Sequence, residues 1–109
     1  MKLFDKSDLL DRLGDDEDFC KEIIELFIED TPHQISELKK AIENNDASMV
    51  HQKAHSLKGS SAQVSALSMQ EIAFQMEQAG EAGNVDRAAT LMSEFEEEFE
   101  KFTRLIAGS

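Results

Sequence analysis

The spacing of apolar residues constrains the fold of this chain more than any other feature of its sequence. Apolar side chains recur three or four residues apart almost from end to end, and no unbroken apolar run is longer than three residues. This is the period of an α-helix that buries one face. The period is interrupted at four short segments, "LGDDED", "NND", "VSAL" and "AGEAGN". The sequence therefore predicts an all-α fold with short connections.

Five helices fit around these interruptions. We expect them, in chain order, at about residues 7–13, 15–42, 46–64, 68–79 and 84–106. The residues expected at their ends are Ser7, Asp15 or Asp16, and Asp46 as N-caps, and Gly80 as a C-terminal cap. Four long helices with short connections predict an antiparallel up-and-down four-helix bundle, to which the short N-terminal helix is added. A chain of 109 residues predicts one domain, residues 1–109.

The second helix contains Pro32, the only proline. Proline removes one helical hydrogen bond, so two separate helices are the alternative to one long helix. The apolar stripe keeps its phase across Pro32, and we therefore expect one helix with a local kink. The residues of that stripe are Cys20, Ile24, Phe27, Ile28, Ile35, Leu38 and Ile42.

The charge of the chain restricts its partners. Asp and Glu number 23 against 11 Lys and Arg, which gives a net charge of −12. Nucleic acids and anionic membranes need basic patches, so we expect neither as a partner. No apolar segment is long enough for a transmembrane span or a signal peptide, and the expected compartment is the cytoplasm. Cys20 is the only cysteine, which excludes an internal disulfide, and we expect a monomer.

His55 lies in the segment "HQKAHSLKGSSAQ" of the third helix. One narrow stripe of this helix has to face the core, and it consists of Ala47, Val50, Ala54, Leu57, Ser61 and Val64. At about 100° per residue, His55 lies roughly 135° from the centre of that stripe. The phase therefore predicts that His55 points outward.

The neighbours of His55 suggest a chemical role. Gly59 lies one turn further on the same face, although a glycine inside a helix costs roughly 1 kcal/mol relative to alanine. A solvent-facing glycine is explained if a large partner must approach the backbone beside His55. Lys58 can place an ammonium group near the imidazole. A nucleophile that receives a phosphoryl group needs these features, because the cation offsets charge on the phosphoryl oxygens.

The stretch "AHSLKGSSAQ" resembles the H-x-x-K-G-small-small signature of histidine-containing phosphotransfer (HPt) domains of bacterial and fungal phosphorelays. The similarity extends over nearly the whole chain, including "FDKSDLLDRLGDDEDFCKEIIELFIEDTPHQISELKKAI" and "EIAFQMEQAGEAGNVDRAATLM". The sequence departs from the family pattern at Ser65, where glycine is usual. This substitution raises a question about the turn between the third and fourth helices.

The resemblance implies that His55 is phosphorylated, that Lys58 contacts the phosphoryl oxygens and that Gly59 provides clearance. Residues of the fourth helix support the histidine in this family, and the candidates are Gln75, Glu77 and Gln78. The implied partners are response-regulator receiver domains and a hybrid sensor histidine kinase. The receiver would supply Mg²⁺, and no cofactor of the chain's own is implied. The sequence has no glycine-rich nucleotide loop, so kinase activity is not expected.

Two other classes of function fit parts of the sequence. His51 and His55 are four residues apart, which allows a shared metal ion. However, "HQKAH" lacks the glutamate of the H-E-x-x-H zinc motif, and inward-facing Glu-x-x-His pairs are missing. A helical interaction module without chemistry is the other alternative. It predicts that changing His55 alters only local contacts.

Overall fold

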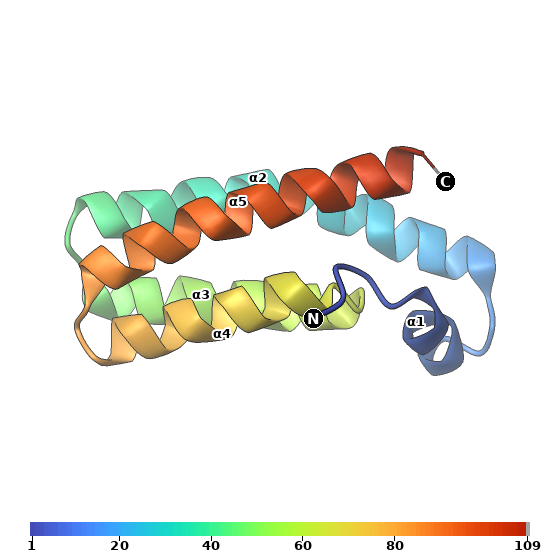
Figure 1. The fold of residues 1–109 in the computed structure, drawn as a ribbon, viewed down its shortest axis with the longest axis horizontal. Coiled ribbons are helices and arrows are strands. Elements are labelled where there is room, and N and C mark those ends of the chain that lie inside the picture. The colour runs from blue at the N-terminus through green and yellow to red at the C-terminus, as the bar shows by residue number, and fades with distance from the viewer. Residues whose placement is uncertain (109) are drawn as a thin grey trace.

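All five expected helices form in the computed structural model, which describes residues 1–108. The helices are α1 (Lys6–Arg12), α2 (Glu17–Glu43), α3 (Ala47–Gln63), α4 (Leu67–Glu81) and α5 (Val85–Ala107). Figure 1 shows α2 to α5 as an antiparallel bundle, with α1 packed across the end where α2 begins. The predicted fold class is confirmed. None of the described helices is long and apolar enough to cross a membrane.

Acidic or amide side chains determine where four of the helices start. Asp16, Asp46 and Asn84 each accept a hydrogen bond from the backbone N–H three residues later, at 3.0 to 3.1 Å. These side chains satisfy N–H groups that have no partner within the helix. The prediction of Ser7 as the first N-cap was wrong. Asp5 caps α1 by accepting from the N–H of Asp8, and this places Ser7 inside the helix.

Helix α2 continues through Pro32 without a break. The chain prefers one helix because the residues on both sides of Pro32 bury the same face, including Phe27, Ile35 and Leu38. Thr31 is also fully buried on this face, where its hydroxyl donates to the Phe27 carbonyl at 2.6 Å. The local kink at Pro32 stays a prediction.

Helices α3 and α4 approach closely at Gly80. A Cβ atom there would lie 2.6 Å from the backbone nitrogen of His51 and 3.0 Å from the carbonyl oxygen of Ala47. The prediction that Gly80 ends α4 as a C-terminal cap was therefore wrong. Gly80 is buried inside the helix, and Gly83 supplies the left-handed residue of the following turn, with φ 73°. Gly80 lets the two backbones come together.

The turn between α3 and α4 is held by helix α1. Ser65 adopts φ 57°, the left-handed conformation that a glycine would take without strain. Its buried hydroxyl donates to Asp8 and accepts from Arg12, each at 2.7 Å. Arg12 also donates to the carbonyls of Ala62 and Gln63. These bonds offset the cost of a left-handed serine and fix the end of α3.

Candidate functional site

His55 lies on the outer surface of α3, as its helical phase predicts. The predicted inward stripe is buried at Val50, Ala54, Leu57 and Ser61, whereas 66% of the His55 side chain is exposed. The imidazole is therefore available to a partner, although its backbone is fixed by a helix packed into the core.

Glu77 joins His55 to Lys58. One carboxylate oxygen lies 2.6 Å from Nδ1 of His55, and the other lies 2.6 Å from Nζ of Lys58. Only 10% of the Glu77 side chain is exposed. A nearly buried carboxylate on α4 thus fixes two side chains that project from α3. We call His55, Lys58, Gly59 and Glu77 the acceptor site.

The protonation of Glu77 determines which nitrogen of His55 can react. Burial alone would raise the pKa of Glu77, but hydrogen bonds and charge from Lys58 and His55 outweigh it and hold this pKa below its usual value. Glu77 is therefore an ionised carboxylate at neutral pH and can only accept hydrogen bonds. Nδ1 of His55 must be the donor. In the neutral ring, Nε2 then carries the free lone pair.

Lys58 and Gly59 complete the acceptor site. Lys58 is only 29% exposed, because Glu77 lies on one side of its ammonium group and the Phe74 ring on another, 5.4 Å away. Gly59 faces open space, since a Cβ atom there would meet nothing within 4 Å. The helical glycine therefore has no packing role, as the clearance argument requires.

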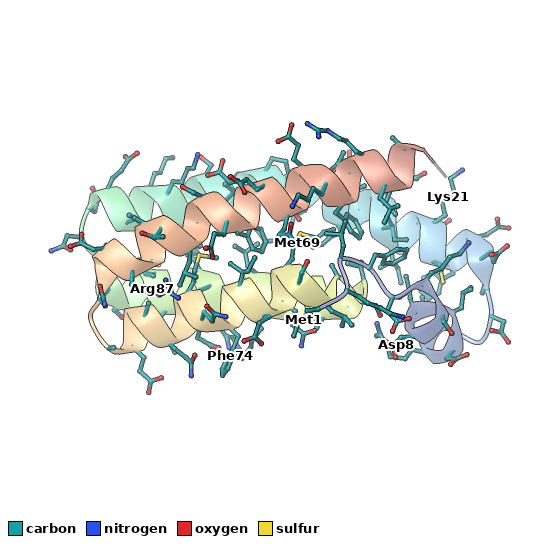
Figure 2. The ribbon with its side chains drawn as sticks, in the orientation of Figure 1. Met1, Asp8, Lys21, Met69, Phe74 and Arg87 are labelled. Atoms are coloured by element: carbon teal, nitrogen blue, oxygen red, sulfur yellow. The ribbon has the colours of Figure 1, made fainter. Side chains whose placement is uncertain are left out.

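The structure distinguishes among the three fourth-helix candidates. Gln75 bonds Glu71 on its own helix and accepts from Arg87 of α5 at 3.3 Å, and so faces away from His55. Figure 2 shows Arg87 on the side of α4 next to α5. Gln78 is exposed. Of the three, Glu77 is the one that is hydrogen-bonded to His55, and the sequence could not select it because all three lie within one helical turn.

The geometry around His51 differs from that around His55. Nδ1 of His51 lies 3.1 Å from the backbone carbonyl of Glu77, and the residue is half-buried between α3 and α4. Within residues 1–108, no three His, Cys, Asp or Glu side chains are grouped in a way that could hold a metal ion. The two histidines thus contact different groups of the same residue.

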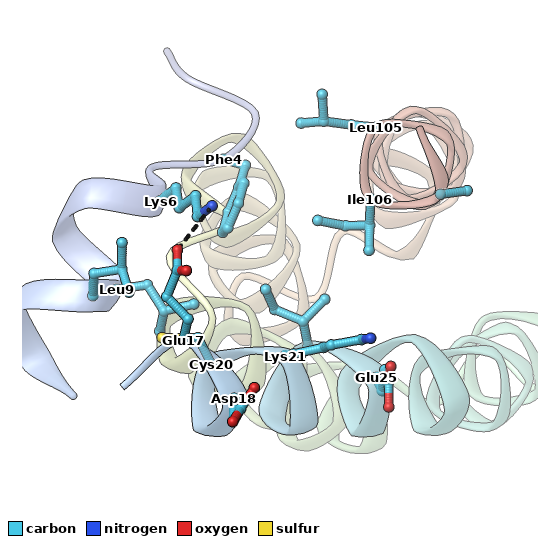
Figure 3. Close-up of a pocket in the computed structure, with 13 residues that line it drawn as sticks. Phe4, Lys6, Leu9, Glu17, Asp18, Cys20, Lys21, Glu25, Leu105 and Ile106 are labelled. Atoms are coloured by element: carbon cyan, nitrogen blue, oxygen red, sulfur yellow. Dashed lines mark ion pairs between the residues drawn. The ribbon is translucent and has the colours of Figure 1, made fainter. Parts of the chain in front are cut away.

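An open pocket beside the N-terminal helix lies away from the acceptor site. It has a volume of about 750 Å³ between α1, the start of α2 and the end of α5, where Phe4, Leu9, Ile24 and Ile106 contribute to its walls. Figure 3 shows these elements around it, with an ion pair between Lys6 and Glu17 at its edge. No residue of the acceptor site lines this pocket.

The site is thus an exposed imidazole on a helical bundle, held at Nδ1 by a nearly buried carboxylate, with Nε2 open to a partner. The Hpt domain family matches residues 22–104, and the chain belongs to this family. Its role is therefore histidine phosphotransfer in a phosphorelay, with response-regulator receiver domains as the partners that the family implies.

A solved structure has the same fold. It is the crystal structure of histidine-containing phosphotransfer protein B (HptB) from Pseudomonas aeruginosa PAO1, with a TM-score of 0.89 and 24% sequence identity. The alignment covers 97% of this chain and 92% of that one. At this identity the likeness shows a shared bundle. The comparison with curated protein sequences finds no match.

Proposed function

We propose that His55 accepts a phosphoryl group from the phospho-aspartate of one receiver domain and passes it to an aspartate of another. The observation that carries this proposal is the contact between the buried Glu77 carboxylate and Nδ1 of the exposed His55. That contact leaves Nε2 as a nucleophile directed by the fold, since a side chain held from one end samples fewer orientations.

In the proposed transfer, the lone pair of Nε2 attacks phosphorus. A P–N bond forms, the P–O bond to the aspartate breaks, and the aspartate leaves as a carboxylate. The proton on Nδ1 stays where it is, so the phosphorylated ring carries a positive charge. Glu77 lies 2.6 Å from that nitrogen and stabilises this charge, as a buried carboxylate does for an imidazolium in other nucleophilic sites.

Both proteins contribute positive charge that stabilises the transferred phosphoryl group. Lys58 is placed to turn from Glu77 toward the phosphoryl oxygens, and Gly59 leaves room for the donor. The receiver supplies Mg²⁺, which offsets charge on the transferred group. The chain acts as a carrier without kinase activity of its own and without a cofactor. We further propose a monomer that works in the cytoplasm and receives phosphate ultimately from a hybrid sensor histidine kinase.

A panel of phosphorylated receiver domains tests the proposal. The wild-type protein should gain phosphate that is acid-labile and base-stable, and peptide mapping should locate it on His55. His55→Gln should gain none, while its free energy of unfolding changes by no more than about 0.5 kcal/mol because the site is exposed. Phosphate retained by His55→Gln would refute the assignment. A protein that accepts phosphate from no receiver would instead support the interaction-module alternative.

A further inference from the structure

We propose that Phe74 is the apolar anchor by which a receiver domain docks beside His55. This inference rests on the proposed function, since the receiver is the partner of the same site. The proposed docking surface is the face that α3 and α4 share around the acceptor site.

The exposure of Phe74 is the first observation. The ring is 39% exposed on α4, whereas the neighbouring Ala73 and Met76 are fully buried. Figure 2 shows Phe74 pointing away from the bundle, on the side of α4 opposite α5. The exposed part of the ring is apolar surface that a partner can cover, and aromatic side chains are enriched among the residues that dominate binding energies.

The position of Phe74 relative to the chemistry is the second observation. Its ring lies 5.4 Å from Nζ of Lys58, which in turn is bonded to Glu77, the partner of His55. The large exposed apolar side chains among residues 1–108 are Met1, Phe19, Leu26, Met49, Phe74 and Leu105. Of these, Phe74 is connected to the acceptor site through Lys58.

The charge of this face indicates the kind of partner. The chain has 23 acidic residues, but none lies in α3, whose two lysines are paired with carboxylates of other helices, Lys53 with Glu37 of α2 and Lys58 with Glu77 of α4. The carboxylate that α4 directs toward His55 is Glu77, which is buried and paired. An anionic phosphoryl group can therefore approach His55 without meeting exposed carboxylates on α3, whereas the other helices would repel it.

The available space agrees with the charge. Gly59 has no heavy atom within 4 Å of its Cβ position, so a partner surface can reach the α3 backbone one turn from His55. The occupant that fits is a receiver domain with an apolar side chain next to its phospho-aspartate. Its apolar group would cover Phe74 while the phosphoryl group faces His55.

The test compares Phe74→Ala with Leu105→Ala, a control at another exposed apolar residue, on α5. The binding probe is the receiver that transfers fastest to the wild type, converted to its beryllofluoride form. Truncation of an anchoring aromatic residue should raise the Kd by at least about tenfold. Leu105→Ala should leave the Kd unchanged. Phosphorylation by phosphoramidate should proceed at the wild-type rate in both variants, because a small donor needs no docking surface.

A second comparison separates docking from an effect through Lys58. Phe74→Ala should still weaken binding in a Lys58→Ala background, although the factor should change because the two side chains are in contact and their effects couple. An unchanged Kd for Phe74→Ala, or a loss that disappears without Lys58, would overturn the docking proposal and leave the proposed function intact. Failure of the wild type to take phosphate on His55 from any donor would refute the proposed function. Failure to bind any receiver would overturn both.

Discussion

Alanine substitutions at Gly59 and Gly80 should change stability in opposite directions. Both glycines lie inside helices, so intrinsic propensity favours alanine at each site by up to about 1 kcal/mol. Their surroundings differ. The Cβ position of Gly59 is in open space, whereas the Cβ position of Gly80 overlaps the backbone of His51. Gly59→Ala should therefore realise the full propensity gain, and Gly80→Ala should not.

The expected magnitudes follow from the contacts. Gly59→Ala should raise the melting temperature by up to roughly 4 °C, since 1 kcal/mol corresponds to about that shift in a domain of this size. At Gly80 the new methyl group would lie 2.6 Å from a backbone nitrogen that cannot rotate away, and the helices must separate. Overpacking typically costs about 1–3 kcal/mol, which outweighs the propensity gain. Gly80→Ala should lower the melting temperature by several degrees.

Thermal and urea unfolding, followed by far-ultraviolet circular dichroism, provide the measurement. Equal urea m-values would show that the unfolded states are comparable. Gly59→Ala should slow transfer from a receiver only mildly, and Gly59→Gln should slow it severely, while phosphorylation by phosphoramidate survives in both. A loss of stability in Gly59→Ala would show that Gly59 is closely packed. A gain in Gly80→Ala would show that α3 and α4 are not in contact there, and either result would refute the reasoning.

Three further substitutions test other contacts. Lys58→Ala should slow phosphotransfer roughly ten- to a hundredfold, because a charge contact worth about 1.4–2.7 kcal/mol is lost, and it should weaken receiver binding less. An unchanged transfer rate would show that Lys58 is only a solvated charge. Glu77→Gln tests the dependence of stability on acidic pH. Because the pKa of Glu77 is lower in the folded state than in the unfolded state, its ionised form stabilises the fold above the usual glutamate pKa. This contribution is lost as the pH falls through the lower folded pKa. Urea titrations at several acidic pH values should therefore show a shallower loss of stability in the variant below about pH 4.5, and parallel curves would contradict the assignment. Arg12→Met should cost about 1–2 kcal/mol by removing the bonds to the α3–α4 turn, and native-state hydrogen exchange should increase at residues 62–66.

The sequence by itself determined the helices and the outward direction of His55. Helical period and side-chain caps are local properties, so Asp16, Asp46 and Asn84 could be expected to start helices from the residues that follow them. The phase of His55 is also local, because it depends only on the buried stripe of the same helix. The one local error among the N-caps arose at Ser7, where Asp5 provides the cap two residues earlier.

The tertiary structure decided the contacts between helices. Glu77 could not be chosen over Gln75 and Gln78 from sequence, because the choice depends on how α4 is rotated against α3. Glycine is a residue type typical of helix ends, yet Gly80 lies inside α4. Its role is to let α4 approach the backbone of His51 on α3. The cost of the left-handed conformation at Ser65 is likewise offset by Arg12 and Asp8, more than fifty residues earlier, which bond its hydroxyl. Side chains distant in sequence determine these roles, and periodicity within one helix contains no information about them.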